Sequence, residues 1–349
     1  MHLMSPPALN FHKPASARNS ETQISSILRL VTFFLFLLIS IYAMHFLING
    51  GLRSIMTSSY GVTNLIVNGG ANADIVISGS SRALTHYDTR VLSAVTGLSS
   101  FNIGRNGSQT DMQLAFLLTY LKHNKPPKLV LHNLDLFSFV TSEEIYDPAQ
   151  YLPYLGEADL LRRIKQIYPN AWKWKHLPLY GYVVEDLRLN WVRGLAAVVG
   201  IQPEEDHFNG YLPRRSKWTG DFELFRQSNP DGVKFKIEAG GIAALSELAK
   251  TCKDRGVPLL FVYSPVYWEM QQLERNRKEV FDRFYDICKQ YDILLWDYST
   301  SSLCRDRSNF YNSQHLNEEG ATKFSQELAH KILTVNPYGV LNSGTSPVN

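Results

Sequence analysis

Three short segments of the chain carry residue types that could perform acyl-transfer chemistry. Residues 79–82 (GSSR) place Ser81 on a tight glycine-led turn. Residues 102–108 (NIGRNGS) contain glycines, which let backbone amides approach a ligand closely. Residues 312–317 (NSQHLN) contain His315. A serine hydroxyl, an imidazole and backbone N–H groups can act as nucleophile, general base and oxyanion donors in ester chemistry.

Each segment alone is a weak signal. A GSS triplet is common in loops, residues 102–108 alone are typical of a turn, and any one of ten histidines is more often incidental than catalytic. The order of a serine turn, a glycine turn and a histidine just before a helix is much more specific. This order favours a catalytic site built from all three segments.

The elements that must position these segments follow from the apolar pattern. Short apolar runs predict five buried strands, at residues 74–78, 99–103, 128–134, 257–263 and 293–297. Amphipathic patterns predict helices near residues 87–96, 109–123, 238–255, 269–290 and 317–333. Strands separated by helices predict a parallel sheet covered on both faces, with ligands at the carboxyl ends of the strands. Asn317 is a candidate cap for the last helix, so His315 is expected to face the ends of the first two strands.

Residues 138–236 lie between the third and fourth predicted strands and are rich in Tyr, Trp and Pro. A structureless loop of this size is uncommon in a compact domain, so a helical insertion or cap over the sheet is expected. Its aromatic side chains are expected to pack the insertion itself. Stacking on sugar rings or contact with a membrane surface are the alternatives.

Residues 30–48 form an apolar run without Asp, Glu, Lys or Arg. At about 1.5 Å per residue, this run matches a hydrocarbon core of roughly 30 Å. It is long for the apolar region of a cleaved signal peptide, the main alternative, and no small-x-small cleavage site follows closely. The chain is therefore expected to divide into a disordered tail (1–29), a transmembrane helix (30–50), a juxtamembrane segment (51–73), an α/β domain (74–334, with insertion 138–236) and a flexible tail (335–349).

Flanking charge predicts the orientation of the span. Lys13, Arg18 and Arg29 precede it, whereas only Arg53 follows closely. The positive-inside rule then places the N-terminus in the cytoplasm. We expect a single-pass protein of the cytoplasmic (inner) membrane with its large domain periplasmic or extracellular.

Charge and cysteine content narrow the classes of partner. A formal charge of +3 without a dense Lys/Arg stripe argues against nucleic acid. Cys252, Cys288 and Cys304 lack metal-ligand spacing and are expected to be buried thiols, with one disulfide as the alternative. Asp74, His86 and Asp88 form no convincing ligand set, so neither a metal nor a cofactor is expected.

The three blocks in this order resemble the SGNH/GDSL hydrolases. More narrowly, the chain looks like the membrane-anchored branch found with cell-envelope and exopolysaccharide O-acylation systems. The family's Gly-Asp-Ser block falls on residues 79–81, with Ser80 at the Asp position, its Asn-x-x-x-x-Gly block on 102–107, and its Asp-x-x-His-Leu-Asn block on 312–317. The resemblance spans residues 74–334 but not the insertion. It implies a flavodoxin-like α/β/α fold with a roughly five-stranded parallel sheet.

The resemblance also assigns roles within the site. It implies that Ser81 is the nucleophile, that His315 is the general base, and that the amides of Ser81 and Gly107 hold the oxyanion. Arg82 and Asn102, which belong to the first two blocks, are expected to line the site.

The chain departs from the family pattern in two blocks. The Gly-x-Asn-Asp block is absent, and Asn133 and Asp135 after the third strand are expected to line the site instead. The triad Asp is replaced by Asn312, with Asp306 six residues upstream as an alternative. The corresponding Asp-to-Asn change in a serine protease costs about 10⁴ in kcat.

Two functions follow as expectations. The first is an esterase or O-acyltransferase acting on acyl esters, acetyl esters foremost, of an envelope or secreted polysaccharide, with a multi-span membrane O-acyltransferase as a candidate partner. The second is a weakly active or non-catalytic glycan-binding or assembly subunit. Asn312 favours the second function, and the pairing of Ser81 with His315 favours the first.

Overall fold

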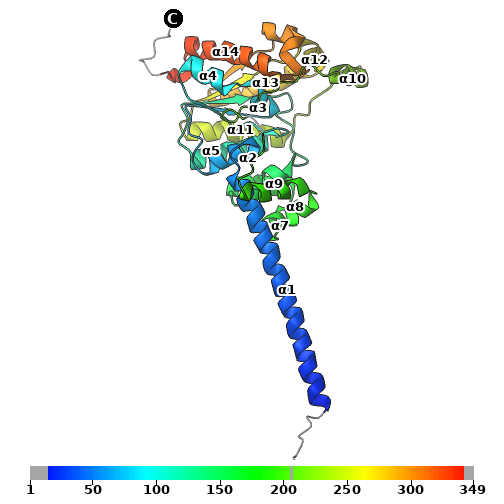
Figure 1. Ribbon diagram of the computed structural model, residues 1–349. Coiled ribbons are helices and arrows are strands. Elements are labelled where there is room, and N and C mark those ends of the chain that lie inside the picture. Colours follow the sequence, from blue (N-terminus) through cyan, green and yellow to red (C-terminus); the bar gives the residue numbers. More distant parts are fainter. Residues whose placement is uncertain (1–14, 205–206, 342–349) are drawn as a thin grey trace, which may run out of the picture.

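The sheet that positions the three segments is parallel and has five strands. The computed structural model describes residues 15–204 and 207–341 (Figure 1). The strands lie in the order β2-β1-β3-β4-β5, which is that of flavodoxin-like sheets. Their bounds are Ile75–Ser78 (β1), Ser100–Asn102 (β2), Leu129–Asn133 (β3), Leu259–Tyr263 (β4) and Leu294–Asp297 (β5). β1, β3 and β4 are buried along their whole length because helices cover both faces, which explains the apolar runs in their sequences.

Helices form a layer on each face of the sheet and complete the predicted α/β/α fold. One layer contains α3 (Ser81–His86), α4 (Thr89–Thr96) and α14 (Glu318–Val335). The other contains α5 (Thr110–His123), α11 (Ala239–Asp254) and α13 (Arg277–Tyr291). Figure 1 shows α4 and α14 above the sheet and α5 and α11 below it. All five predicted strands are present, and the predicted fold class is confirmed.

The remaining elements connect or flank these layers. They are α1 (Ala15–Ser54), α2 (Ser58–Val67), α12 (Trp268–Leu273), the small strands β6 (Phe310–Asn312) and β7 (His315–Leu316), and, within the insertion, α6 (Ala158–Ile167), α7 (Ala171–His176), α8 (Tyr180–Val184), α9 (Arg188–Val198) and α10 (Asp221–Ser228). Five short 3₁₀ helices span Pro148–Gln150, Leu152–Tyr154, Ser302–Arg305, Arg307–Asn309 and Pro337–Gly339. The insertion is thus helical, and buried aromatic side chains such as Tyr151, Tyr154 and Tyr182 pack it.

The helices follow the predictions except in two places. The helix predicted near residues 87–96 is present as α4, where the Asp88 side chain accepts the N–H of Arg90 (3.0 Å), but an additional helix, α3, precedes it and begins at Ser81. The helix predicted over residues 269–290 is divided into α12 and α13. Asn317 caps α14 by accepting the N–H of Gly320 (2.9 Å), as predicted.

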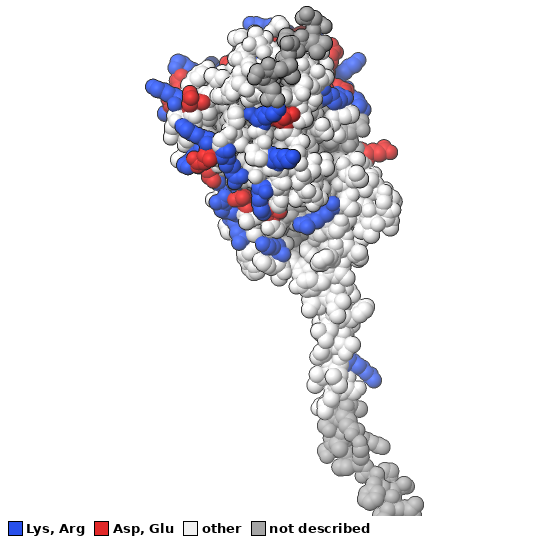
Figure 2. All heavy atoms as spheres, turned by 90° about the vertical axis from the view of Figure 1, so that its left-hand side faces the viewer, with Lys and Arg blue, Asp and Glu red and all other residues white. Residues whose placement is uncertain are grey.

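The N-terminal helix is longer than the predicted span. α1 is continuous over residues 15–54 and includes one stretch, Gln23–Ser54, long and apolar enough to cross a membrane. Residues 15–29, expected to belong to a disordered tail, are helical. The rest of that tail (1–14) and part of the expected C-terminal tail (342–349) lie outside the described residues. Figure 2 shows the part of this helix just below the domain as a stalk on which one basic side chain is visible among uncharged ones.

The end of α1 belongs to the folded domain. Ile48 and Leu52 are fully buried, and α1 crosses α9 at a pair of glycines. A Cβ atom at Gly51 would lie 1.8 Å from the carbonyl oxygen of Gly194, and one at Gly194 would lie 2.7 Å from the carbonyl oxygen of Ile48. The two helix backbones are therefore in direct contact, as in membrane helix pairs built on small residues.

This contact predicts that alanine substitutions at two neighbouring glycines have very different effects on stability. Gly51→Ala is expected to force α9 away from α1 and to lower the free energy of unfolding by about 1–3 kcal/mol, the usual cost of overpacking. Gly50→Ala is the matched control because a Cβ atom there meets no other atom within 4 Å. Thermal unfolding of the full chain in detergent measures both. Equal melting temperatures for the two variants would contradict the crossing.

Candidate active site

Ser81 lies at the carboxyl end of β1, on a turn that only glycine permits. Gly79 has φ +144°, and a Cβ atom there would lie 2.8 Å from the Cβ of Ala83. The chain turns at this point, and Ser81 becomes the first residue of α3. The turn thus places the Ser81 hydroxyl at the edge of the sheet where a ligand is expected.

His315 reaches Ser81 from a small hairpin at the other end of the domain sequence. β6 and β7 pair antiparallel, with Asn312 opposite His315. The Nε2 atom of His315 lies 2.8 Å from Ser81 Oγ, and its Nδ1 atom lies 2.9 Å from Asn312 Oδ1. The three side chains form a continuous line of hydrogen bonds between segments 234 residues apart. Asp306 instead accepts the N–H of Ser308 (2.9 Å) and is exposed.

The orientation of the Asn312 amide determines which nitrogen of His315 carries the proton. Asn312 Oδ1 accepts the backbone N–H groups of Gln314 (3.1 Å) and His315 (2.9 Å), so oxygen must occupy that position. The same oxygen faces His315 Nδ1, which must then be the protonated nitrogen. Nε2 retains its lone pair and can accept the proton of Ser81. The hairpin backbone thereby supplies the tautomer control that is lost in a protease when the triad Asp becomes Asn.

The surroundings of His315 keep the imidazole neutral. Burial and, to a smaller extent, the nearby positive charges of Arg82 and Arg214 together lower the pKa of His315 to about 3. The ring of Tyr311 stacks on His315 with a centroid distance of 5.3 Å. The base is therefore in its proton-accepting form at neutral pH. Asn312 brings no negative charge to stabilise the imidazolium that forms when the proton is transferred.

His86, which the sequence suggested only as an unconvincing metal ligand, supports the base. Its Nε2 atom accepts the backbone N–H of Leu316 (3.0 Å), and its Nδ1 atom lies 2.9 Å from Ser264 Oγ. The ring stands edge-on to His315, with centroids 6.0 Å apart. His86 therefore fixes the strand that carries the base. A histidine at the end of α3 has no sequence signal for this role, because its partners lie on distant segments.

Arg82 and Asp135 form a buried ion pair beneath Ser81. Arg82 Nη1 lies 3.0 Å from Asp135 Oδ1, and the side chains are only 4% and 1% exposed. Ser80 Oγ donates to Asp135 Oδ2 (2.6 Å), and Arg82 also donates to the backbone and side chain of Ser264. The structure thus places Arg82 and Asp135 in a platform that holds the nucleophile turn. Both side chains also line a small cavity of about 20 Å³.

Asn133 belongs to the same platform. It is fully buried at the end of β3. Its Oδ1 accepts the hydroxyl of Tyr87 (2.8 Å), and its Nδ2 donates to the carbonyl of Leu134 (3.1 Å). These bonds occupy the amide that could otherwise have donated to an oxyanion.

The loop after β2 is fixed directly against the nucleophile turn. The N–H of Arg105 donates to the carbonyl of Gly79 (3.0 Å), and Asn102 Nδ2 donates to the carbonyl of Ala83 (2.7 Å). Gly107 takes φ +63°, and its N–H and that of Ser81 donate to no acceptor among the described residues. The backbone N–H groups of Ser81 and Gly107 are thus available to donate to an oxyanion that forms beside Ser81.

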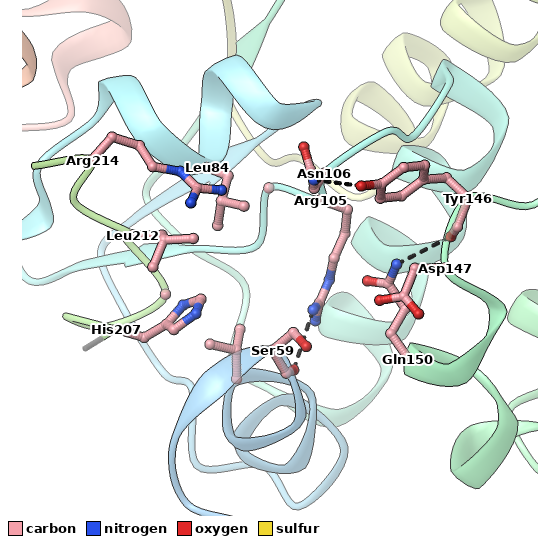
Figure 3. Close-up of a pocket in the computed structure, with 13 residues that line it drawn as sticks. Ser59, Leu84, Arg105, Asn106, Tyr146, Asp147, Gln150, His207, Leu212 and Arg214 are labelled. Atoms are coloured by element: carbon pink, nitrogen blue, oxygen red, sulfur yellow. Dashed lines mark hydrogen bonds between the residues drawn. The ribbon is translucent and has the colours of Figure 1, made fainter. Parts of the chain in front are cut away.

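A polar cavity of about 150 Å³ lies beside this site (Figure 3). Its lining includes Ser59 of α2, Leu84 of α3, Arg105 and Asn106 of the loop after β2, and, from the insertion, Asp147, Gln150 and Arg214. Figure 3 shows Arg214 and Leu84 on one side of the cavity and Asp147 and Gln150 across from them. Leu84 follows Ser81 by one helical turn, and Arg214 is close enough to lower the pKa of His315. The cavity is therefore near Ser81 and His315, although neither of these two side chains lines it.

Several solved structures are similar to the chain, among them one described as a lipolytic protein and one described as an acylhydrolase. The chain is similar, at 11% identity and a TM-score of 0.35, to a lipolytic protein of the G-D-S-L family from Desulfitobacterium hafniense, covering 74% of this chain and 98% of that one. It is similar, at 9% identity and a TM-score of 0.32, to an acylhydrolase from Bacteroides fragilis, covering 76% and 88%. No family model and no curated protein sequence matches the chain.

Proposed function

We propose that the chain is a membrane-anchored serine esterase or O-acyltransferase that acts on acyl esters of an envelope or secreted polysaccharide. The observation that carries this proposal is the line of hydrogen bonds from Ser81 through His315 to Asn312, with the proton on Nδ1. A scaffold protein has no need of a serine hydroxyl at 2.8 Å from an unprotonated imidazole nitrogen.

The reaction proceeds through an acyl-enzyme. Ser81 Oγ attacks the ester carbonyl as its proton passes to His315 Nε2, and the backbone donors near Ser81 stabilise the tetrahedral anion. The anion collapses, the ester C–O bond breaks, and the leaving alcohol takes the proton from His315. Water or a sugar hydroxyl then gives its proton to His315 and attacks the acyl-enzyme. The bond between the acyl carbon and Ser81 Oγ breaks, and His315 returns the proton to Ser81 Oγ. Asn312 Oδ1 holds the imidazole in place throughout.

Two features support a polymer at the membrane as the substrate. The cavity beside the site is lined by side chains that hydrogen-bond hydroxyl groups, such as Asn106, Asp147 and Gln150. The end of α1 is part of the domain core, so cleavage of α1 as a signal peptide would remove Ile48 and Leu52 from that core. An anchored domain with its N-terminus in the cytoplasm suits a glycan outside the membrane, and a multi-span O-acyltransferase in the same bilayer is a fitting acyl donor.

Labelling with a fluorophosphonate probe tests the proposal on the full chain in detergent. Wild type is expected to be labelled, whereas Ser81→Ala and His315→Ala are not. Ser302→Ala, at an exposed serine, is the control and should be labelled like wild type. A folded wild-type chain that takes no label would overturn the catalytic proposal. A separate assay of the unlabelled wild-type chain with an aryl ester, run with and without oligosaccharide acceptors, then separates transfer from hydrolysis.

A non-catalytic glycan-binding or assembly subunit is the second candidate function. Asn312 favours it because no carboxylate supports the imidazolium. In this case the residues that line the cavity would be needed to bind the polysaccharide, whereas Ser81 and His315 would not. The labelling experiment separates the two candidates.

A further inference from the structure

The exposed apolar side chains of the domain are concentrated on one part of the insertion. Residues 183–201, which include α9 and the end of α8, contain seven large apolar side chains that are at least half exposed, namely Val183, Val184, Leu189, Val192, Val198, Val199 and Ile201. A concentration of exposed apolar side chains on a folded domain marks an interaction site. We call these seven side chains the insertion patch.

The insertion patch lies where α1 enters the domain. Figure 1 shows α7, α8 and α9 around the upper end of α1, on the underside of the domain. α9 is held there by the contact of Gly194 with Ile48 and Gly51. The patch is therefore fixed to the one segment whose length and composition suit a membrane span.

The length of the apolar run places the membrane boundary at the same level. The 19 residues from 30 to 48 rise by about 28 Å, close to the thickness of a hydrocarbon core of roughly 30 Å. If the run fills the core, the boundary falls near Ile48, which is the residue that α9 contacts. The exposed face of α9 then lies in the interface between hydrocarbon and water, where amphipathic helices bind.

A hollow beside α1 has the composition of a lipid headgroup site. It measures about 380 Å³ and lies between α1 and α7. Arg53 and Lys175 provide positive charge, and Phe46, Leu155 and Trp174 provide apolar surface. Basic and aromatic side chains at one level are typical of proteins that contact the headgroups of anionic lipids. This chemistry favours a bilayer over a protein partner as the surface that covers the patch.

We infer that the insertion patch rests in the lipid interface and gives the domain a second membrane contact beside α1. The inference depends on the part of the proposed function in which α1 spans the membrane, and it is independent of the catalytic part. Its consequence is that α1 and the patch together fix the tilt of the domain on the bilayer.

Single labelled cysteines test the inference on the full chain. The native Cys252, Cys288 and Cys304 are free and buried, so an added exposed cysteine can be labelled selectively. Val192→Cys reports on the patch, and Leu224→Cys on α10 is the matched control because the two native side chains are 64% and 65% exposed. Both variants carry an NBD fluorophore in vesicles of phosphatidylcholine and phosphatidylglycerol that contain nitroxide-labelled lipids.

The label at position 192 is expected to be quenched by the nitroxide lipids at least about twofold more than the label at 224, since interfacial helices insert roughly 5–10 Å. Equal, weak quenching in a chain that floats with the vesicles would overturn the inference and leave the span intact. If quenching is weak in pure lipid vesicles but the cysteine at position 192 is protected from labelling in native membranes, a protein partner covers the patch. That result also overturns the inference. A chain that does not float would overturn both the span and the patch. Fluorophosphonate labelling is unaffected in every case.

Discussion

Replacing Asn312 with Ala is expected to lower kcat for ester cleavage by about 10²–10⁴, whereas Asp at this position is expected to raise it by about tenfold. Ala removes the only acceptor that fixes the proton on His315 Nδ1. Asp keeps all three hydrogen bonds and adds the charge that stabilises the imidazolium. The gain is modest because the tautomer is already correct and only the charge is missing. Initial rates with an aryl acetate measure both variants.

The pH dependence of kcat/KM distinguishes a role of Asn312 in holding the His315 imidazole from a purely structural role. In wild type the pKa of His315 is lowered to about 3, so the base stays neutral and kcat/KM should be flat from pH 8 down to pH 5. In Asn312→Asp the carboxylate favours the imidazolium and raises this pKa, so the rate should begin to fall at a higher pH. Gln314→Glu adds the same charge on a residue that makes no contact with the imidazole and is the matched control. Identical profiles for Asn312→Asp and wild type would refute the assignment.

The burial of His315 also predicts how the free energy of unfolding changes with pH. The unfolded chain binds a proton at His315 near pH 6.5, and the folded chain does so only near pH 3. The stabilisation is therefore complete above pH 6.5 and is lost as the pH falls from 6.5 towards 3. The Asn312→Asp variant should lose less stability in this range.

Asp135→Ala is expected to lower the free energy of unfolding by about 3–5 kcal/mol, the cost of leaving a buried charge without its partner. Arg82 is 4% exposed and would keep its charge in an apolar interior. Activity should fall as well, because Ser80 and Arg82 hold the turn on which Ser81 stands. Chemical denaturation measures the stability change.

An exposed ion pair provides the control for Asp135. Lys278 and Asp282 lie 2.8 Å apart with side chains 88% and 56% exposed, so Asp282→Ala should cost no more than about 1 kcal/mol. The double variant Arg82→Met, Asp135→Leu removes both buried charges and should be more stable than Asp135→Ala alone. If Asp135→Ala were no more harmful than Asp282→Ala, the platform would not depend on this ion pair.

Much of the fold could be predicted because the strands are buried on both faces. Runs such as residues 257–263 are apolar throughout and bounded by breakers, which distinguishes them from half-exposed strands. Parallel topology then brings the ends of β1 and β2 together, whatever their separation in sequence. This is why short blocks around Ser81 and His315 were enough to predict one site.

The parts that could not be predicted depend on contacts between distant segments. β6 and β7 are three and two residues long and have no periodicity to detect. The orientation of the Asn312 amide depends on the backbone of that turn, so the Asp-to-Asn change alone suggested a loss of function. Asp135 follows a strand end, where polar residues usually face a ligand, but its ion pair with Arg82 turns it into the interior.

The uninterrupted passage of α1 into the domain core has a consequence for how this protein meets its substrate. No flexible linker separates the span from the fold, because Ile48 and Leu52 are still within α1 when they enter the core. If α1 spans a bilayer as proposed, Ser81 is held at a constant height above it. A small ester diffusing in solution would gain nothing from this arrangement, whereas a polymer emerging from a neighbouring membrane complex would meet the site by a search in two dimensions.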